Sequence, residues 1–253
     1  IRGGLAGTRF LVEEPGHHHH PHDHGHHHGR NWSEIRDLLK KSKLAPPVRD
    51  SALAMFHRVA EAEAKLHGVP VETVHFHEVG AVDSIVDLVC AAAGVHHLKV
   101  TEITATTPVD GTGTIHCAHG KFPLPAPATA EILRGISIRQ IDVPHELTTP
   151  TGAAILAQLV KKFGPLDSFA AEKIGYGLGT RDLPDRPNVL RAFLGQSSTS
   201  QGRRDLVVEI RTHLDDITGE HLAHAIDRLM AEGALDAAAS PLLMKKARTG
   251  PLL

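Results

Sequence analysis

The sequence PPVRDSALAMFHRVAEAEAKLHG, residues 46–68, has the pattern of one long amphipathic helix. Its apolar side chains recur at the three- and four-residue spacing that places them on one face of a helix. They are Leu53, Phe56, Val59 and Ala60. The two prolines cannot continue a preceding helix, and Gly68 is suited to the left-handed conformation that ends one. We therefore predict a helix over residues 48–67 with one face in the core.

Patterns on both sides of this segment predict a mixture of helices and strands. Further helices are expected at 33–44, capped by Ser33, and at 83–97. Another should run from Pro150 to Phe163, with Thr149 as its N-cap and Gly164 after its end. Alternating or β-branched runs predict strands at 74–79, 100–106 and 189–194, and the glycine-rich stretch 175–181 is expected to be a turn. The predicted fold class is α+β, with a mixed main domain over residues 1–196.

A polar stretch at 197–204 separates this domain from the rest of the chain and is interpreted as a linker. Residues 206–213 and 234–243 are expected to be strands. Between them lies a helix whose apolar stripe consists of Leu222, Ile226, Leu229 and Met230, and which Gly233 ends. Residues 205–253 are therefore predicted to be a βαβ-like piece of a second domain. Since the sequence opens at Ile1 without a methionine and stops at Leu253, we expect a fragment of a longer protein.

Composition excludes some functions. A formal net charge of −2 gives no basic field for nucleic acid, and no apolar run reaches the length of a membrane span. The chain has 2 cysteines, too few for a disulfide framework, so a cytoplasmic setting is expected. Cys90 is predicted to be a buried thiol on the apolar face of a helix. The outlier is histidine, with 21 residues.

A low-complexity tract, HHHHPHDHGHHH at residues 17–28, holds nine of these histidines. Neutral imidazole suits nickel, zinc and copper, and nine imidazoles offer several exchangeable sites. The alternative is a purification tag, but the internal position and the interruptions by Pro21, Asp23 and Gly25 argue against it. We predict metal ligation, with nickel against zinc left open, by His17, His18, His19, His20, His22, His24, His26, His27 and His28.

A second candidate site lies where the strand at 74–79 meets the next helix. His75 and His77 would share one face of the strand, and Glu78 follows them. Asp83 and Asp87, four residues apart, would share one face of the helix. These imidazoles and carboxylates could converge on a metal ion. In the alternative reading, Asp83 is a helix cap and the histidines lie at a solvated edge.

A third candidate is the segment from Asp110 to Lys121. Its glycines and hydroxyls could let backbone amides approach a phosphate. His116 and His119 are either metal ligands or ordinary loop residues, and the sequence does not decide between these readings.

The last candidate lies in the tail. Asp215, Asp216 and Glu220 surround a helix start, and Lys245, Lys246 and Arg248 follow the last predicted strand. Carboxylates that bind a hard divalent cation, opposed to a basic cluster, are the usual means of holding a nucleoside triphosphate. The alternative is one capping aspartate and solvated cations.

Several of these strings together resemble the LarC-type nickel-insertion proteins. They are HFHEVGAVDSIVD (75–87), HGKFPLPAPATAEIL (119–133), ELTTPTGAAIL (146–156), GYGLGTRD (175–182), LDDITGE (214–220) and the tail from GALD (233–236) to MKKARTG (244–250). The resemblance covers nearly the whole chain in order, and family members carry a variable His-rich insert at the place of residues 17–28. Against the family pattern, an opening segment and most of the C-terminal domain are absent, and Ala247-Arg248-Thr249 stands where Gly-Arg-Pro is usual.

The resemblance implies that the protein inserts nickel into pyridinium-3,5-bisthiocarboxylic acid mononucleotide, forming nickel–sulfur and nickel–carbon bonds. It implies a lyase-type nickel cyclometallase that consumes CTP with Mg²⁺ or Mn²⁺ and supplies lactate racemase-type enzymes. It also implies that residues 205–253 belong to a ferredoxin-like, CTP-associated domain, and we expect a homo-oligomer. Catalysis would fall to His75, His77, Glu78 and Asp83, and nickel ligation to His75, His77, His116 and His119. The rival hypotheses are a non-catalytic nickel store or metallochaperone, and a metal-dependent hydrolase that needs no CTP.

Overall fold

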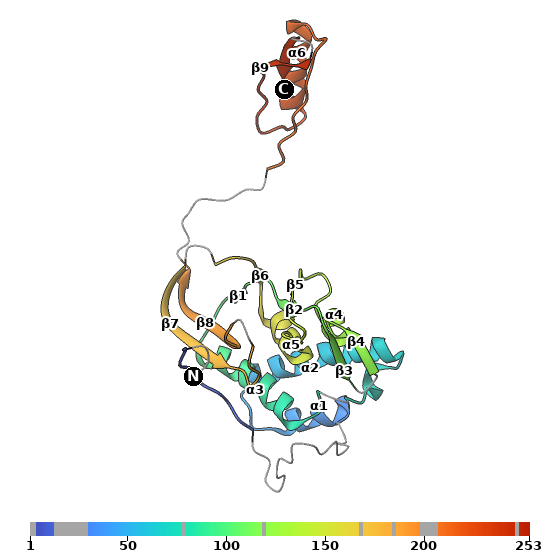
Figure 1. Ribbon diagram of the computed structural model, residues 1–253, viewed down its shortest axis with the longest axis vertical. Helices are drawn as coiled ribbons and strands as arrows, with labels where there is room; N and C mark the ends of the chain where they lie inside the picture. The colour runs from blue at the N-terminus through green and yellow to red at the C-terminus, as the bar shows by residue number, and fades with distance from the viewer. Residues whose placement is uncertain are drawn as a thin grey trace. The chain divides into compact units, whose positions relative to one another are not determined.

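The computed structural model describes residues 4–12, 30–76, 79–117, 120–166, 169–183, 186–197, 207–245 and 248–253. The chain forms two compact units, Ile1–Thr199 and Ser200–Leu253 (Figure 1). Helices and small two-stranded sheets alternate along it, which confirms the predicted α+β class. Among the residues described, no helix is long and apolar enough to cross a membrane. The predicted linker and the histidine tract lie almost entirely outside the described residues.

The first unit contains most of the helices. They are α1 (Trp32–Lys41), α2 (Pro46–His67), the 3₁₀ turn η1 (Val71–Thr73), α3 (Val82–His97), α4 (Pro127–Ile132) and α5 (Pro150–Leu159). Its strands are β1 (Thr104–Ala105), β2 (Val109–Gly111), β3 (Thr114–Cys117), β4 (Gly120–Pro123), β5 (Arg139–Ile141), β6 (Lys162–Phe163), β7 (Phe169–Leu178) and β8 (Val189–Ser197). Strands β1–β6 and β2–β5 pair in parallel, whereas β3–β4 and β7–β8 are antiparallel hairpins.

Helix α2 is the centre of the core in this unit. It contacts α1, α3, α4 and α5, and its buried face comprises Val48, Ala52, Met55, Phe56, Val59, Ala60, Ala62 and Ala64. The prolines occupy its first turn, where a missing amide hydrogen is tolerated, so the helix begins two residues before the predicted Val48. Gly68 ends it with φ 64°, as predicted.

Other helix boundaries differ from the prediction for local reasons. Helix α1 is preceded by Asn31 rather than Ser33 as its N-cap, and it ends at Lys41, where the Ser42 hydroxyl donates to Leu39 O at 2.6 Å. Thr149 caps α5 as predicted, with its Oγ1 accepting from Gly152 N at 3.2 Å. The helix stops at Leu159 instead of Phe163 because Lys162 and Phe163 pair with β1.

The strand predictions are corrected more strongly. Of the segment 74–79, residue 75 makes only an isolated bridge, and of 100–106 only Thr104–Ala105 pair. The glycine-rich stretch predicted as a turn belongs instead to strand β7 as far as Leu178, paired with β8 and bridged to Thr8. Cys90 is exposed on α3, not buried as predicted, because α3 turns a different face to the core.

The second unit contains α6 (Gly219–Ala231) and an antiparallel hairpin of β9 (Ser240–Leu243) and β10 (Thr249–Leu252). Of the predicted strand 206–213, the described residues up to 211 are unpaired; Thr212 and Leu214 hydrogen-bond to Leu253 and Pro251. Strand β9 occupies only the end of the predicted strand at 234–243. Residues 212–214 and β9 both pair antiparallel with β10, so they run parallel to each other on either side of it, with α6 between them in the sequence. This arrangement does not contradict the predicted βαβ-like order. Gly233 follows the helix with φ 101°, in agreement with its predicted role. The assignment to a ferredoxin-like domain stays a prediction.

Gly111 lies where two backbone segments of the first unit touch. A Cβ atom there would lie 2.2 Å from both the Val143 and the His145 carbonyl oxygens. The neighbouring Asp110 is fully buried, and its Oδ1 accepts from Gly111 N at 2.9 Å and from Leu147 N at 2.8 Å. The segment that follows β5 is therefore held directly against β2.

We predict that Gly111→Ala lowers the free energy of unfolding of the first unit by about 3 kcal/mol or more, since backbone atoms cannot move aside cheaply. Gly94→Ala is the matched control, because Gly94 lies in α3 with nothing near its Cβ position. This control should gain up to about 1 kcal/mol from helix propensity. Urea unfolding followed by the fluorescence of Trp32, the single and buried tryptophan, measures both. Equal losses in the two variants would contradict the prediction.

Candidate functional site

The backbone around His75 is held by a short antiparallel pairing with residues 30–32. Trp32 N donates to Val74 O at 3.1 Å, Phe76 N donates to Arg30 O at 3.2 Å, and Asn31 forms a bridge with His75. Val74 and Phe76 are 1% and 0% exposed, so they point into the core. Because side chains alternate along an extended segment, His75 points outward and is exposed.

The imidazole of His75 is itself held by a side chain. Its Nδ1 lies 2.7 Å from Oδ1 of Asn31, the residue that precedes α1. Nearby, Arg30 Nη1 donates to Gly80 O at 3.2 Å, and a Cβ on Gly80 would lie 2.6 Å from Arg30 N. The residues that directly follow the histidine tract in sequence are thus packed against the segment that carries His75. The predicted His77 and Glu78 lie outside the described residues.

Asp83 and Asp87 lie on exposed positions of α3. Asp83 lies in the first turn of this helix, where its Oδ1 accepts from Ser84 N at 2.7 Å. The N-cap is Ala81, so the alternative reading of Asp83 as the helix cap is wrong. Partial burial, with a smaller effect from the charge of Asp83, raises the pKa of Asp87 above its ordinary value. Within the described part of the chain, no three His, Cys, Asp or Glu side chains are grouped closely enough to hold a metal ion. His75, Asp83 and Asp87 therefore do not form such a site by themselves.

The third candidate is a hairpin. His116 lies on β3 opposite Lys121 of β4 and is exposed, while His119 lies outside the described residues. Gly111 and Gly113 serve packing, since their Cβ positions are filled by the backbone of residues 143–145. The phosphate contact that the sequence suggested stays a prediction.

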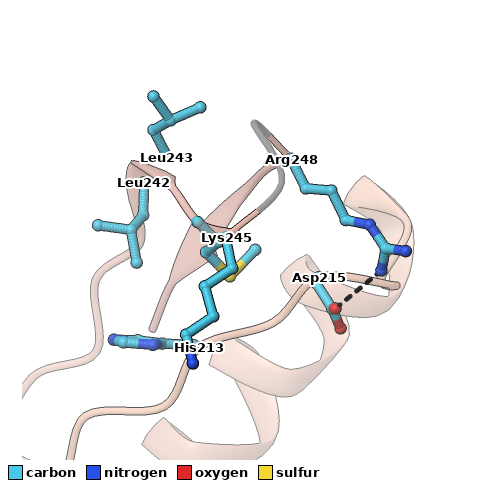
Figure 2. Close-up of a pocket in the computed structure, with 7 residues that line it drawn as sticks. His213, Asp215, Leu242, Leu243, Lys245 and Arg248 are labelled. Carbon is cyan, nitrogen blue, oxygen red and sulfur yellow. Dashed lines mark hydrogen bonds and ion pairs between the residues drawn. The ribbon is translucent and has the colours of Figure 1, made fainter.

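The second unit has a pocket of about 550 Å³. It is lined by His213, Asp215, Leu242, Leu243, Met244, Lys245 and Arg248 (Figure 2). Arg248 and Asp215 point toward each other, and Arg248 Nη1 lies 3.4 Å from Asp215 Oδ2. The pocket thus joins one carboxylate with two cationic side chains, Lys245 and Arg248.

Three of the six residues predicted for nucleotide binding line this pocket, namely Asp215, Lys245 and Arg248. Asp216 and Glu220 are not among the lining residues, and Lys246 is outside the described residues. Thr218 caps α6, with Oγ1 accepting from His221 N at 3.3 Å, which places Glu220 in the first helical turn. Sequence reasoning missed His213, although its two-residue spacing from Asp215 on an extended segment is the signal that could have indicated it.

Comparisons with known proteins agree along the whole chain. The family model described as "Nickel insertion protein" matches residues 1–253. A pyridinium-3,5-bisthiocarboxylic acid mononucleotide nickel insertion protein of Geobacillus kaustophilus is 46% identical over 266 residues, covering 100% of this chain and 64% of the relative. A putative nickel insertion protein of Syntrophotalea carbinolica is 49% identical over 250 residues, covering 98% of this chain and 61% of the relative.

The chain therefore spans somewhat less than two thirds of the length of these relatives. No solved structure matches it. Since the family model and the relatives cover this chain from end to end, including the segments around His75 and the pocket of the second unit, the chain belongs to the nickel insertion protein family.

Proposed function

We propose that this chain takes part in the insertion of nickel into pyridinium-3,5-bisthiocarboxylic acid mononucleotide, the step that completes a nickel-pincer cofactor. The observation that carries the proposal is 46% identity, over all of this chain, to a relative whose name states that activity. The histidine-rich composition supports it, because imidazoles suit Ni²⁺. Nickel is a substrate in this reaction, not a resident cofactor.

Different parts of the chain would have different tasks. The tract at 17–28 would collect nickel, and the exposed His75, with the predicted ligands His77, His116 and His119, would receive it. The pairing of residues 30–32 with 74–76 supports this order, since Arg30 follows the tract by two residues in the sequence and pairs with the segment that carries His75.

Formation of the nickel–carbon bond requires a base. The ring carbon loses a proton as it bonds to nickel, and the proton passes to a protein group. The predicted candidates are Glu78, Asp83 and a histidine of the same region. Asp87 joins them, because its raised pKa makes it a stronger base than an ordinary aspartate.

The pocket of the second unit is the proposed site for CTP. Lys245 and Arg248 would bind phosphate oxygens, and Asp215 would contact the Mg²⁺ or Mn²⁺ that accompanies them. The Arg248–Asp215 contact holds these opposite charges together, so nucleotide and cation would have to separate them. A cytoplasmic homo-oligomer and a lactate racemase-type client complete the proposal.

The direct test is incubation of the protein with the precursor, Ni²⁺, CTP and Mn²⁺, followed by mass spectrometry. A nickel-containing mononucleotide is the expected product, and the Geobacillus relative, treated identically, is the positive control. Product from the relative but not from this chain would contradict the proposed activity for this chain. Product without CTP would contradict its CTP dependence.

Replacement of the nine tract histidines by serine separates insertion from storage. If the tract only collects nickel, product formation should fall at limiting nickel and should match that of the unchanged protein at saturating nickel. The measurement is the initial rate of product formation as a function of nickel concentration. A nickel store or metallochaperone would give no product at any concentration, and loss at saturating nickel would place the chemistry in the tract itself.

The pocket assignment predicts that Lys245→Ala and Arg248→Ala each weaken CTP binding about tenfold or more, since each removes a charge-assisted contact worth roughly 1.5–3 kcal/mol. Arg228→Ala is the matched control, because Arg228 is an exposed arginine of α6 that contacts Glu232 and does not line the pocket. Calorimetric titration with CTP and Mn²⁺ gives the dissociation constants. An equal, small effect in all three variants would mean that these residues attract CTP only through nonspecific charge. That result would contradict the pocket as the CTP site.

A further inference from the structure

The contact between Asn31 and His75 determines which ring nitrogen of the histidine can bind a metal ion. The Asn31 atom that lies 2.7 Å from His75 Nδ1 is the carbonyl oxygen Oδ1, which can only accept a hydrogen bond. With Oδ1 in this position, the contact is a hydrogen bond only when Nδ1 carries the hydrogen. In the neutral ring, the lone pair that binds metals is then on Nε2.

Asn31 is suited to hold this orientation because its backbone is fixed. Its backbone N–H donates to Glu34 Oε2 at 2.8 Å, and its backbone carbonyl oxygen accepts from Glu34 N and Ile35 N, both at 3.1 Å. Its position before α1 and its backbone bridge to His75 hold the two residues next to each other. The His75 backbone is fixed in turn by the buried Val74 and Phe76 on either side.

We infer that Asn31 is a positioning residue for nickel transfer, which orients the His75 imidazole and directs its Nε2 to the metal ion. Histidine ligands in metal sites commonly donate their other ring N–H to an oxygen acceptor, which fixes the tautomer and the ring orientation. The Asn31–His75 pair has this arrangement. The inference rests on the proposed function, in which His75 receives nickel.

Asn31 prepares one nitrogen ligand of the proposed nickel site. An oriented ligand lowers the entropy lost on metal binding.

The test uses the full chain with the nine tract histidines replaced by serine, so that they do not mask a single imidazole. Asn31→Ser keeps a residue that is favourable at an N-cap but is too short to reach the imidazole in the same way, whereas Asn31→Asp keeps both the cap and the acceptor. His75→Gln removes the proposed ligand. Asn188→Ser is the matched control, because Asn188 is an asparagine of the same unit that contacts Arg181 O.

Three measurements are made on each protein. Long-range ¹H–¹⁵N NMR of the metal-free protein reports which nitrogen of His75 carries the hydrogen. We expect Nδ1–H in the unchanged, Asn31→Asp and Asn188→Ser proteins, and a shift toward Nε2–H in Asn31→Ser. Nickel titration should show affinity weakened roughly 10- to 100-fold in Asn31→Ser, at least as much in His75→Gln, and little in Asn31→Asp or Asn188→Ser. Urea unfolding should leave the Asn31 variants close to the parent, which separates positioning from folding.

The outcomes are distinguishable. An unchanged tautomer or an unchanged nickel affinity in Asn31→Ser, together with weaker binding in His75→Gln, overturns the positioning role and leaves His75 as a ligand. Unchanged nickel affinity in His75→Gln shows that His75 is not a nickel ligand. In that case the part of the proposed function that assigns nickel to His75 fails, and the inference fails with it. Loss in Asn31→Ser with retention in Asn31→Asp supports the inference, since a merely structural asparagine would not require an acceptor.

Discussion

The burial of Phe76 against α2 is the contact on which the arrangement of the candidate metal site depends. The ring of Phe76 is fully buried and lies 6.4 Å from that of Phe56, centroid to centroid. Burying a phenylalanine side chain is worth about 2–3 kcal/mol, enough to fix the direction of an extended segment. With Phe76 and Val74 directed inward, His75 can only point outward, toward Asn31.

The same contact connects the core with the chemistry proposed for the chain. Helix α2 contacts four other helices, so the segment that packs on it is attached to the centre of the core of the first unit. Residues 30–32 pair with this segment and lead into α1, which packs on α2 as well. The proposed nickel ligand His75 is therefore held on both sides by segments anchored to the same helix.

The second unit is held together differently. None of its described residues, 207–245 and 248–253, is buried, and α6 leaves Leu229 and Met230 43% and 46% exposed. Its organisation depends on backbone pairing of β9 with β10 and of residues 212–214 with 251–253. The pocket lies beside this pairing. Its charged side chains lie next to the paired segments: Asp215 follows residues 212–214, and Lys245 and Arg248 lie between β9 and β10 in the sequence. An exposed ion pair such as Arg248–Asp215 contributes little to the stability of the fold. Little stability would therefore be lost if these two side chains separated to bind the proposed nucleotide and cation.

Features that depend on neighbouring residues could be predicted from the sequence: the long helix α2 and its end at Gly68, the Thr149 cap of α5, and Gly233 after α6. The histidine tract also predicted metal binding, because imidazole chemistry requires no fold to be recognised, but nickel in place of zinc came only from the family resemblance. Contacts in the folded chain were needed to show that the glycine-rich 175–178 forms a strand, that Cys90 is exposed, and that Asn31 meets His75. These features depend on contacts between segments that are far apart in the sequence. Strand β7 pairs with β8, and residue 31 contacts residue 75. Local periodicity carries no information about such pairings, because their free energy comes from contacts that exist only after the chain has folded.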